Sequence, residues 1–340
     1  MNSGKEPNFA RCAISPKLSI VVVSDCDSQN LRMALACLRA QTVSNMLEVI
    51  IVTSSKERLN LDPRELEGFF NGRVLELRSH GNEGQAKAAG IVAAGAPLVA
   101  FMEDHSYPEP GYAKALIEAH CNGDFAAVGP VMLNANPHST VSWGCFLVFY
   151  GPWMAAQPEA EVEHLPGNQS CYKRNVLVEY GPRLAEMLES ESLLHWDLIA
   201  KGYKLHLEPT SKVYHLNFSL LSPLLFEHFL ASRVFAANRA RGWGAPRRLH
   251  YALGSPLLPM IRLVRILKDA ARAELGARVV VRAFVALTLN LCAGSAGEML
   301  GYAFGPGEAR ERLVRFEEKR HLYVTTRDLE AVAKLRICAQ

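Results

Sequence analysis

Four short apolar runs, separated by segments with helical spacing, restrict the folds open to this chain more than any other feature. The runs cover residues 18–23, 48–52, 74–77 and 97–102, and each has the length of a buried strand. Between the last two runs, residues 84–96 are rich in Ala and Gly, as in a helix that packs closely on a sheet. Alternating strands and helices at this spacing predict an α/β fold with a mostly parallel, Rossmann-like sheet.

The fourth run ends in a group of potential metal ligands. Glu103, Asp104 and His105 follow it directly, and the turn residues Pro108 and Gly111 come next. In an open α/β sheet, ligands bind beyond the carboxyl ends of the strands. Carboxylate oxygens suit Mg²⁺ and Mn²⁺, and an imidazole shifts the preference toward Mn²⁺. The triplet therefore points to a cation or phosphate site, with a solvated acidic turn as the alternative.

Further apolar runs extend the predicted sheet well beyond the fourth strand. We therefore expect one α/β domain over residues 18–218, preceded by a polar tail of residues 1–17. Four more segments are expected to be strands: residues 125–128, 145–149, 203–207 and 212–216.

Composition excludes some classes of partner and compartment. A net charge of +3 on 340 residues gives no reason to expect a nucleic-acid partner. The eight cysteines form no CxxC pair and no zinc-like spacing, which is typical of reduced cysteines in a cytosolic protein. Residues 1–17 lack the apolar middle of a signal peptide, so the functional part is expected on the cytoplasmic side.

The amino-acid composition of the chain changes near residue 219. Residues 219–310 are expected to be helical, apolar and rich in Arg, and residues 311–340 to form a charged tail or helix. Residues 283–303 are long enough to span a bilayer, but Asn290 and Glu298 within them argue against a true span. Apolar residues mixed with Arg suit a helix that lies on an anionic membrane surface. An ordinary helical bundle with a basic outer face is the alternative.

Taken together, these segments resemble the family 2 glycosyltransferases of the GT-A fold. The resemblance covers about residues 18–217, and no single piece of it suffices alone. The C-terminal helices, with residues 297–302, look more weakly like those of bacterial members that act on envelope or exopolysaccharide glycans. The similarity lies in residues 18–24, 48–52, 82–91, 101–112, 166–174 and 213–215.

The resemblance implies a role for each matching position. The family's catalytic base falls on Glu191, or on Glu189 if the loop is one turn out of register. Its metal site falls on Glu103, His105 and His215, with Mn²⁺ or Mg²⁺ as the cofactor. Nucleotide and donor contacts are implied for Val23, Ser24, Asp25, Thr53, Ser54, Asn82, Lys87 and Asp104, and acceptor-side contacts for Gly167, Asn168 and Ser170.

The chain departs from the family pattern at three places. Thr53 and Ser54 stand where the family has acidic residues that help to contact the nucleobase, but both hydroxyls can bond a uracil edge. Glu103-Asp104-His105 replaces the family's DxD segment, and Val23-Ser24 replaces Pro-Thr. An additional positive charge near the diphosphate is implied for Lys87 or Arg174, with a plain surface position as the alternative for both.

The expected activity is an inverting, metal-assisted transfer of a sugar from a nucleotide donor to a lipid-linked or glycan acceptor. A UDP-sugar is the favoured donor and a GDP-sugar the second choice, with the enzyme peripheral at the inner face of the cell membrane. A nucleotidyltransferase is disfavoured because residues 24–28 hold no Gly and no basic residue. A non-catalytic glycan-binding or scaffold subunit of a polysaccharide synthase stays open. Scattered positions of Glu103, His105, Glu191 and His215 would favour that second class.

Overall fold

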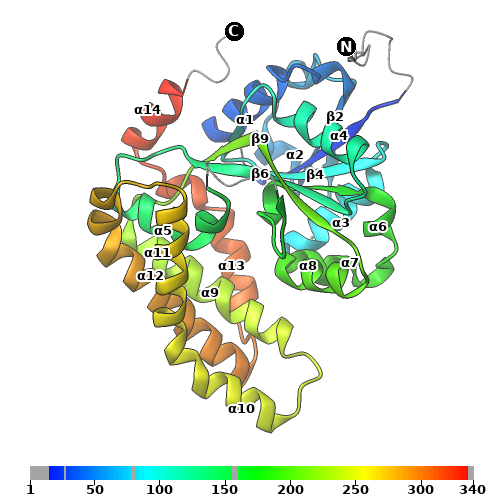
Figure 1. Ribbon diagram of the computed structural model, residues 1–340. Helices are drawn as coiled ribbons and strands as arrows, with labels where there is room; N and C mark the ends of the chain where they lie inside the picture. Colours follow the sequence, from blue (N-terminus) through cyan, green and yellow to red (C-terminus); the bar gives the residue numbers. More distant parts are fainter. Residues whose placement is uncertain (1–14, 27, 78–81, 155–159, 336–340) are drawn as a thin grey trace, which may run out of the picture.

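The computed structural model describes residues 15–26, 28–77, 82–154 and 160–335, and it is organised around one mixed sheet (Figure 1). Nine strands run in the order β3-β2-β1-β4-β8-β6-β9-β5, with β7 paired to β9. β1, β2, β3 and β4 pair in parallel, as do β6 and β9. The strands are β1 Leu18–Val23, β2 Leu47–Thr53, β3 Asn71–Glu76, β4 Leu98–Glu103, β5 Ser106–Pro108, β6 Ala127–Asn134, β7 Ala160–Glu161, β8 Cys171–Lys173 and β9 Leu205–His215.

Helices cover both faces of the parallel half, because the side chains of β1, β2 and β4 are almost all buried there. One apolar core joins the sheet to α1 and α4, and a second joins its other face to α3, α6, α7 and α8. Gly90 lets α3 approach the sheet, since a Cβ there would come within 2.4 Å of Val21. These helices are α1 Gln29–Arg39, α2 Lys56–Leu59, α3 Glu83–Ala93, α4 Tyr112–Asn122, α5 Thr140–Tyr150, α6 Arg174–Val178, α7 Leu184–Glu189 and α8 Glu191–Ala200.

Three local predictions are wrong. Residues 145–149 belong to α5 and not to a strand, because a short apolar run suits a buried helix equally well and Ser139 caps this one. The two expected strands at 203–207 and 212–216 are one bulged strand, β9. Cys37 is disulfide-bonded, so the expectation of reduced cysteines fails there, whereas Cys26, Cys121, Cys145, Cys171 and Cys292 are free.

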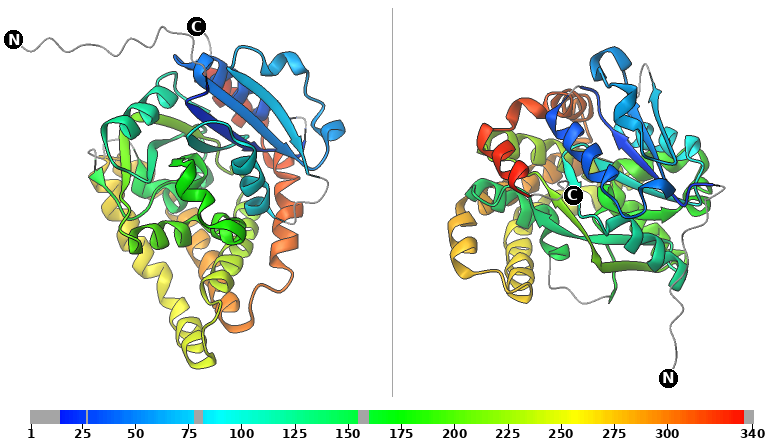
Figure 2. Two further views of the ribbon diagram at one scale, coloured as in Figure 1. Left: turned by 90° about the vertical axis from the view of Figure 1, so that its right-hand side faces the viewer. Right: turned by 90° about the horizontal axis from the view of Figure 1, so that it is seen from above.

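The C-terminal helices pack against the sheet domain and against one another (Figures 1 and 2). α9 and α12 lie in close contact because α12 presents glycines there: a Cβ at Gly297 would lie 2.2 Å from the Phe229 carbonyl oxygen. α14 returns to the sheet domain, where Val332 packs with Ala34 and Tyr107. These helices are α9 Leu221–Arg239, α10 Ala245–Gly254, α11 Leu258–Arg272, α12 Ala277–Phe304, α13 Ala309–Glu317 and α14 Thr326–Lys334.

The expected class is confirmed: an α/β fold with a mainly parallel sheet is followed by apolar helices. By length and composition, α12 is the one helix of the described residues that could cross a membrane, with a mean hydropathy of 1.7 in its most apolar stretch. Buried positions make up 39% of that stretch, because one face packs on α9 and α5. Most of the predicted tail 1–17 and the end of the predicted segment 311–340 lie outside the described residues.

Candidate functional site

A cavity of about 690 Å³ opens at the carboxyl ends of β1 and β4 and extends to α9, α11 and α13. Parallel strands end at this edge, so side chains far apart in the sequence meet there. The sequence-predicted residues that line the cavity are Val23, Ser24, Asp25, Asn82, Lys87, Glu103, Asp104, His105, Asn168, Glu189, Glu191 and His215.

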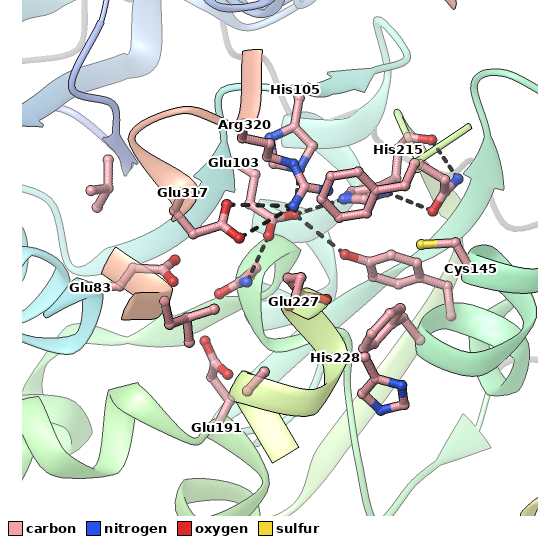
Figure 3. Close-up of a pocket in the computed structure, with 18 of the residues that line it drawn as sticks. Glu83, Glu103, His105, Cys145, Glu191, His215, Glu227, His228, Glu317 and Arg320 are labelled. Carbon is pink, nitrogen blue, oxygen red and sulfur yellow. Dashed lines mark hydrogen bonds and ion pairs between the residues drawn. The ribbon is translucent and has the colours of Figure 1, made fainter. Parts of the chain in front are cut away.

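Glu103, His105 and His215 form a compact cluster on one side of the cavity (Figure 3). Glu103 ends β4, and His215 ends β9, which pairs with β5 immediately after His105. Their potential ligand atoms all lie within 4.8 Å of one another. Glu103 Oε2 is 3.1 Å from His215 Nε2 and 3.9 Å from His105 Nε2.

Neighbouring side chains orient both imidazoles toward Glu103. The Asn217 amide nitrogen donates to other oxygens, so its Oδ1 accepts from His215 Nδ1 at 3.0 Å. His105 Nδ1 donates to Asp104 Oδ1 at 3.0 Å. His215 Nε2 therefore faces the Glu103 carboxylate, and His105 Nε2 is buried without a hydrogen-bond partner in the described part of the chain.

This donor set fits a divalent cation. Burial lowers the pKa of His215 to about 4, so at neutral pH no proton lies between its Nε2 and the Glu103 carboxylate. Burial also works to raise the pKa of Glu103, but His105, His215 and Arg320 hold it well below its usual value. The Glu103 carboxylate and the neutral His215 imidazole then face each other as two acceptors, with the buried His105 Nε2 beside them, and a shared divalent cation would stabilise this arrangement.

The Glu103 carboxylate is also held from the other side. Asn168 Nδ2 donates to Oε1 at 2.8 Å, and Gln169 Nε2 donates to Oε2 at 2.7 Å. Tyr150, whose ring packs on His215, donates its hydroxyl to Oε2 at 3.3 Å. These donors fix the carboxylate in one orientation before any ligand arrives.

The predicted donor-binding residues lie around the ends of β1 and β2. Ser24 Oγ donates to Asp104 Oδ2 at 2.6 Å. Asp25 Oδ1 accepts from the Ser54 backbone N–H at 2.5 Å and from Thr53 Oγ1 at 3.3 Å. Thr53 and Ser54 do not line the cavity themselves, so their connection to it runs through Asp25.

Lys87 and Glu191 form a second polar group in the cavity. Lys87 is buried, not a plain surface residue, and its Nζ lies 2.5 Å from Glu191 Oε1. Burial works to lower the pKa of Lys87, but Glu191 and Glu83 raise it above its ordinary value. Lys87 also donates to Asn168, which connects this pair to Glu103. Glu191 points into the cavity in Figure 3.

Glu189 has a different environment, although it is only two residues away. Its carboxylate accepts from Arg310 through both oxygens, at 2.5 and 2.9 Å. Asn82 Nδ2 donates to it at 3.0 Å and Asn238 Nδ2 at 2.7 Å. Four donors therefore engage Glu189, and it ties α7 to α9 and α13.

Like Thr53 and Ser54, three further residues from the sequence analysis lie outside the cavity lining. Ser170 is fully buried, and its hydroxyl donates to the Pro166 carbonyl oxygen at 2.9 Å. Gly167 packs directly on Glu191, since a Cβ there would lie 2.5 Å from the Glu191 side chain. Arg174 donates to carbonyl oxygens at the end of α3. Gly167 thus supports the cavity wall from behind, whereas the backbone N–H of Arg174 bonds the Pro97 carbonyl oxygen at the start of β4, the opposite end of that strand from the cavity.

The sequence analysis missed several side chains of the cavity. Arg320 begins a short 3₁₀ turn (Arg320–Tyr323) three residues after the end of α13. It lies beside Glu317 at 3.4 Å and over the ring of Phe218 at 4.0 Å. Figure 3 shows it next to Glu103 and His105. Glu227 on α9 faces the same space. No local pattern marks these residues, whereas Gln169 lay in a segment already singled out.

No protein-family model matches the chain, and no curated protein matches it. Solved structures are similar at low identity. The structure of GalNAc-T7 with UDP, GalNAc and Mn²⁺ is 13% identical with a TM-score of 0.48, over 60% of this chain and 43% of that one. S. aureus TarS 1–349 is 15% identical with a TM-score of 0.47, over 87% and 92%. Its complex with UDP-GlcNAc is 14% identical with a TM-score of 0.45, over the same shares. The chain thus spans less than half of the GalNAc-T7 structure.

Proposed function

We propose that this chain is a metal-assisted glycosyltransferase that uses a nucleotide-sugar donor. The observation that carries the proposal is the convergence of Glu103, His105, His215 and Glu191 on one cavity. The site offers a cation-binding cluster for a diphosphate and, connected to it through Asn168 and Lys87, a carboxylate suited to deprotonate an acceptor hydroxyl. A non-catalytic subunit would not need a cation-binding cluster next to a catalytic base. For such a subunit we would expect the four side chains to be scattered, whereas here they line one cavity.

The donor half of the reaction requires charge compensation at the diphosphate. Glu103, His105 and His215 would hold the divalent cation, and their two imidazoles favour Mn²⁺ over Mg²⁺. When bound, such a cation supplies Lewis-acid stabilisation of the departing diphosphate. Arg320 adds a fixed positive charge beside the cluster. The hydroxyls near Asp25 suit a uracil edge, so UDP-sugars are the favoured donors and GDP-sugars the second choice.

The acceptor half requires a base on the opposite side of the sugar. Glu191 takes the proton as the acceptor oxygen forms its bond to the anomeric carbon and the bond to the diphosphate oxygen breaks. A single displacement of this kind inverts the anomeric centre and needs no enzyme nucleophile. Lys87 holds Glu191 Oε1, so the other carboxylate oxygen is left to meet the acceptor, and Asn168 lies between the two halves.

The cellular setting proposed with this activity is surface polysaccharide synthesis by a family 2, GT-A type enzyme. We assign residues 18–218 to the transfer reaction, and residues 219–310 to a helical region at the inner face of the cell membrane. The acceptor would be lipid-linked or a glycan. The basic and apolar composition of the helical region supports this setting.

Calorimetric titration of the purified chain with UDP and with GDP, each with Mn²⁺ or EDTA, tests the proposal. We expect binding of UDP that requires Mn²⁺ and that Glu103→Ala abolishes, because the cluster loses its only carboxylate. Glu208→Ala serves as the matched control, since Glu208 is a half-buried carboxylate of β9 outside the cavity. If the folded chain binds neither nucleotide, the non-catalytic alternative replaces this proposal.

A further inference from the structure

An exposed apolar stripe runs along the outer helices of the C-terminal region. α10 and α11 follow one another through a short 3₁₀ turn, with right-handed helical backbone at Gly254, Ser255 and Leu257. Residues 245–272 therefore form a nearly continuous rod, drawn in yellow in Figure 1. The exposed large apolar side chains along it are Leu249, Leu253, Leu257, Met260, Ile261, Val264 and Leu267.

These side chains lie on one side of the rod. At 3.6 residues per turn, their spacing confines them to about one third of the helix circumference. The exposure is large, with Leu253 71%, Met260 68% and Leu257 65% accessible. α12 packs beside both helices and exposes Val281 and Val285 to a similar extent. A contiguous apolar surface of this kind marks an interaction site.

The charge along the same rod indicates the kind of partner. Residues 245–272 hold six Arg or Lys side chains and one acidic residue, Asp269. By helical spacing, Arg247, Lys268 and Arg272 follow one border of the apolar stripe. An apolar face bordered by basic residues is complementary to anionic lipid headgroups above an acyl layer.

The rod is also connected to the candidate active site. Arg262, Arg265 and Ile266 of α11 line the same cavity as Glu103 and Glu191. Arg262 forms an ion pair with the buried Glu298 of α12, which fixes this side of α11 to the helical region. By the same helical spacing, Arg262 and Ile266 lie on the side of α11 opposite the apolar stripe, so the helix separates the stripe from the cavity.

We propose that residues 245–272 dock on the surface of an anionic bilayer, with the apolar stripe in the boundary between headgroups and acyl chains. Docking in this orientation leaves α11 between the lipid surface and the cavity, a separation of about one helix diameter. A lipid-linked acceptor held in the bilayer would then lie close to the cavity, and this consequence, unlike the docking itself, rests on the proposed function.

Flotation of the full chain with lipid vesicles tests the docking. We expect it to float with phosphatidylcholine vesicles that contain phosphatidylglycerol, to bind pure phosphatidylcholine weakly, and to be released by high salt. Replacing both Leu253 and Leu257 by Glu should lower vesicle binding by about tenfold or more, because two charges would enter the apolar boundary. Lys268→Glu should lower it by a smaller factor and only for anionic vesicles.

Val92→Glu is the matched control, since Val92 is 67% exposed but lies on α3. It should bind vesicles as the unaltered chain does. Metal-dependent UDP binding, measured on the same variants, separates loss of docking from loss of the proposed function. Equal flotation of the Leu253/Leu257 double variant would overturn the proposal. So would retention after carbonate extraction, which indicates insertion of α12, or light scattering that shows the stripe pairing two copies of the chain.

Discussion

Two carboxyl groups face the same cavity from opposite walls, and their acidities move in opposite directions. Glu103, on the sheet wall, has a pKa well below its usual value because imidazoles and Arg320 surround it. Glu227, on the helical wall, has a pKa raised to about 8 by burial and by the neighbouring carboxylate of Glu317. At pH 7 the first is therefore ionised and the second mostly protonated.

The difference follows from how each wall is built. The sheet wall brings strand ends together, and there the side-chain amides of Asn168 and Gln169 each donate one hydrogen bond to the Glu103 carboxylate. The helical wall brings Glu227 and Glu317 together from α9 and α13, with Arg320 as the nearby cation. The sheet wall is thus prepared to hold a cation, whereas the helical wall limits how much negative charge the cavity accumulates.

The largest expected effect concerns Glu191, which extends the sheet wall. Glu191→Gln should lower the rate of sugar transfer by about 10²- to 10⁴-fold, because the amide cannot accept the acceptor proton. Binding of UDP with Mn²⁺ should remain. UDP release from the donor, with a membrane lipid extract as the source of acceptor, measures the rate.

Glu189→Gln is the matched control for that change. It should keep most of the activity but lower the free energy of unfolding by about 1–3 kcal/mol, because it breaks the ion pair with the partly exposed Arg310. Thermal or urea unfolding measures this loss. The opposite pattern, an inactive Glu189→Gln and an active Glu191→Gln, would move the base to Glu189.

The next largest effect tests whether the helical wall takes part in the reaction or only closes the cavity. Arg320→Met should lower kcat for transfer by about 10²-fold, because a charge near the departing diphosphate is lost. Arg320→Lys should restore part of it. Arg312→Met is the control, since Arg312 lies over the ring of Phe226 and outside the cavity lining. Equal activity of all three variants would leave Arg320 with a structural role only.

The smallest expected effect tests the difference in pKa between Glu103 and Glu227. Glu227→Gln should change UDP affinity at pH 7 by no more than about twofold, because the carboxyl it replaces is already neutral. As pH rises through about 8, the unaltered chain gains a negative charge and should lose affinity, whereas the variant should not. Because the raised pKa means that ionisation favours the unfolded chain, its free energy of unfolding should also fall as pH rises from the ordinary value of 4.5 to about 8. Parallel pH profiles of the two proteins would refute the assignment.

Glu103 could be placed from the sequence because ligands bind beyond the carboxyl ends of the strands in an open α/β sheet. His215 joined the same predicted site through the resemblance to the family 2 glycosyltransferases. The structure brings them to 3.1 Å. The sequence did not identify Asn217 and Gln169 as the residues that orient these side chains. Hydrogen-bond directions depend on side-chain positions, which the hydrophobic periodicity of the sequence does not specify.

Hydrophobic pattern was less informative for the helical segments than for the strands. Residues 145–149 are as apolar as a strand and became α5, because burial on all sides removes the pattern that separates the two. Lys87 was open to a surface interpretation, and only its burial beside Glu191 reveals its role. Arg320 gave no local signal at all.

By itself, the sequence determined the α/β class, the order of the early strands and the ligand types at their ends, since these follow from hydrophobic period and local chemistry. Only the tertiary structure decided which carboxylate is bound by Arg310, which one faces the cavity, and that Arg320 reaches a site built more than 100 residues earlier in the chain. The physical reason is that contacts between distant segments depend on the packing of whole helices, which no short stretch of residues encodes.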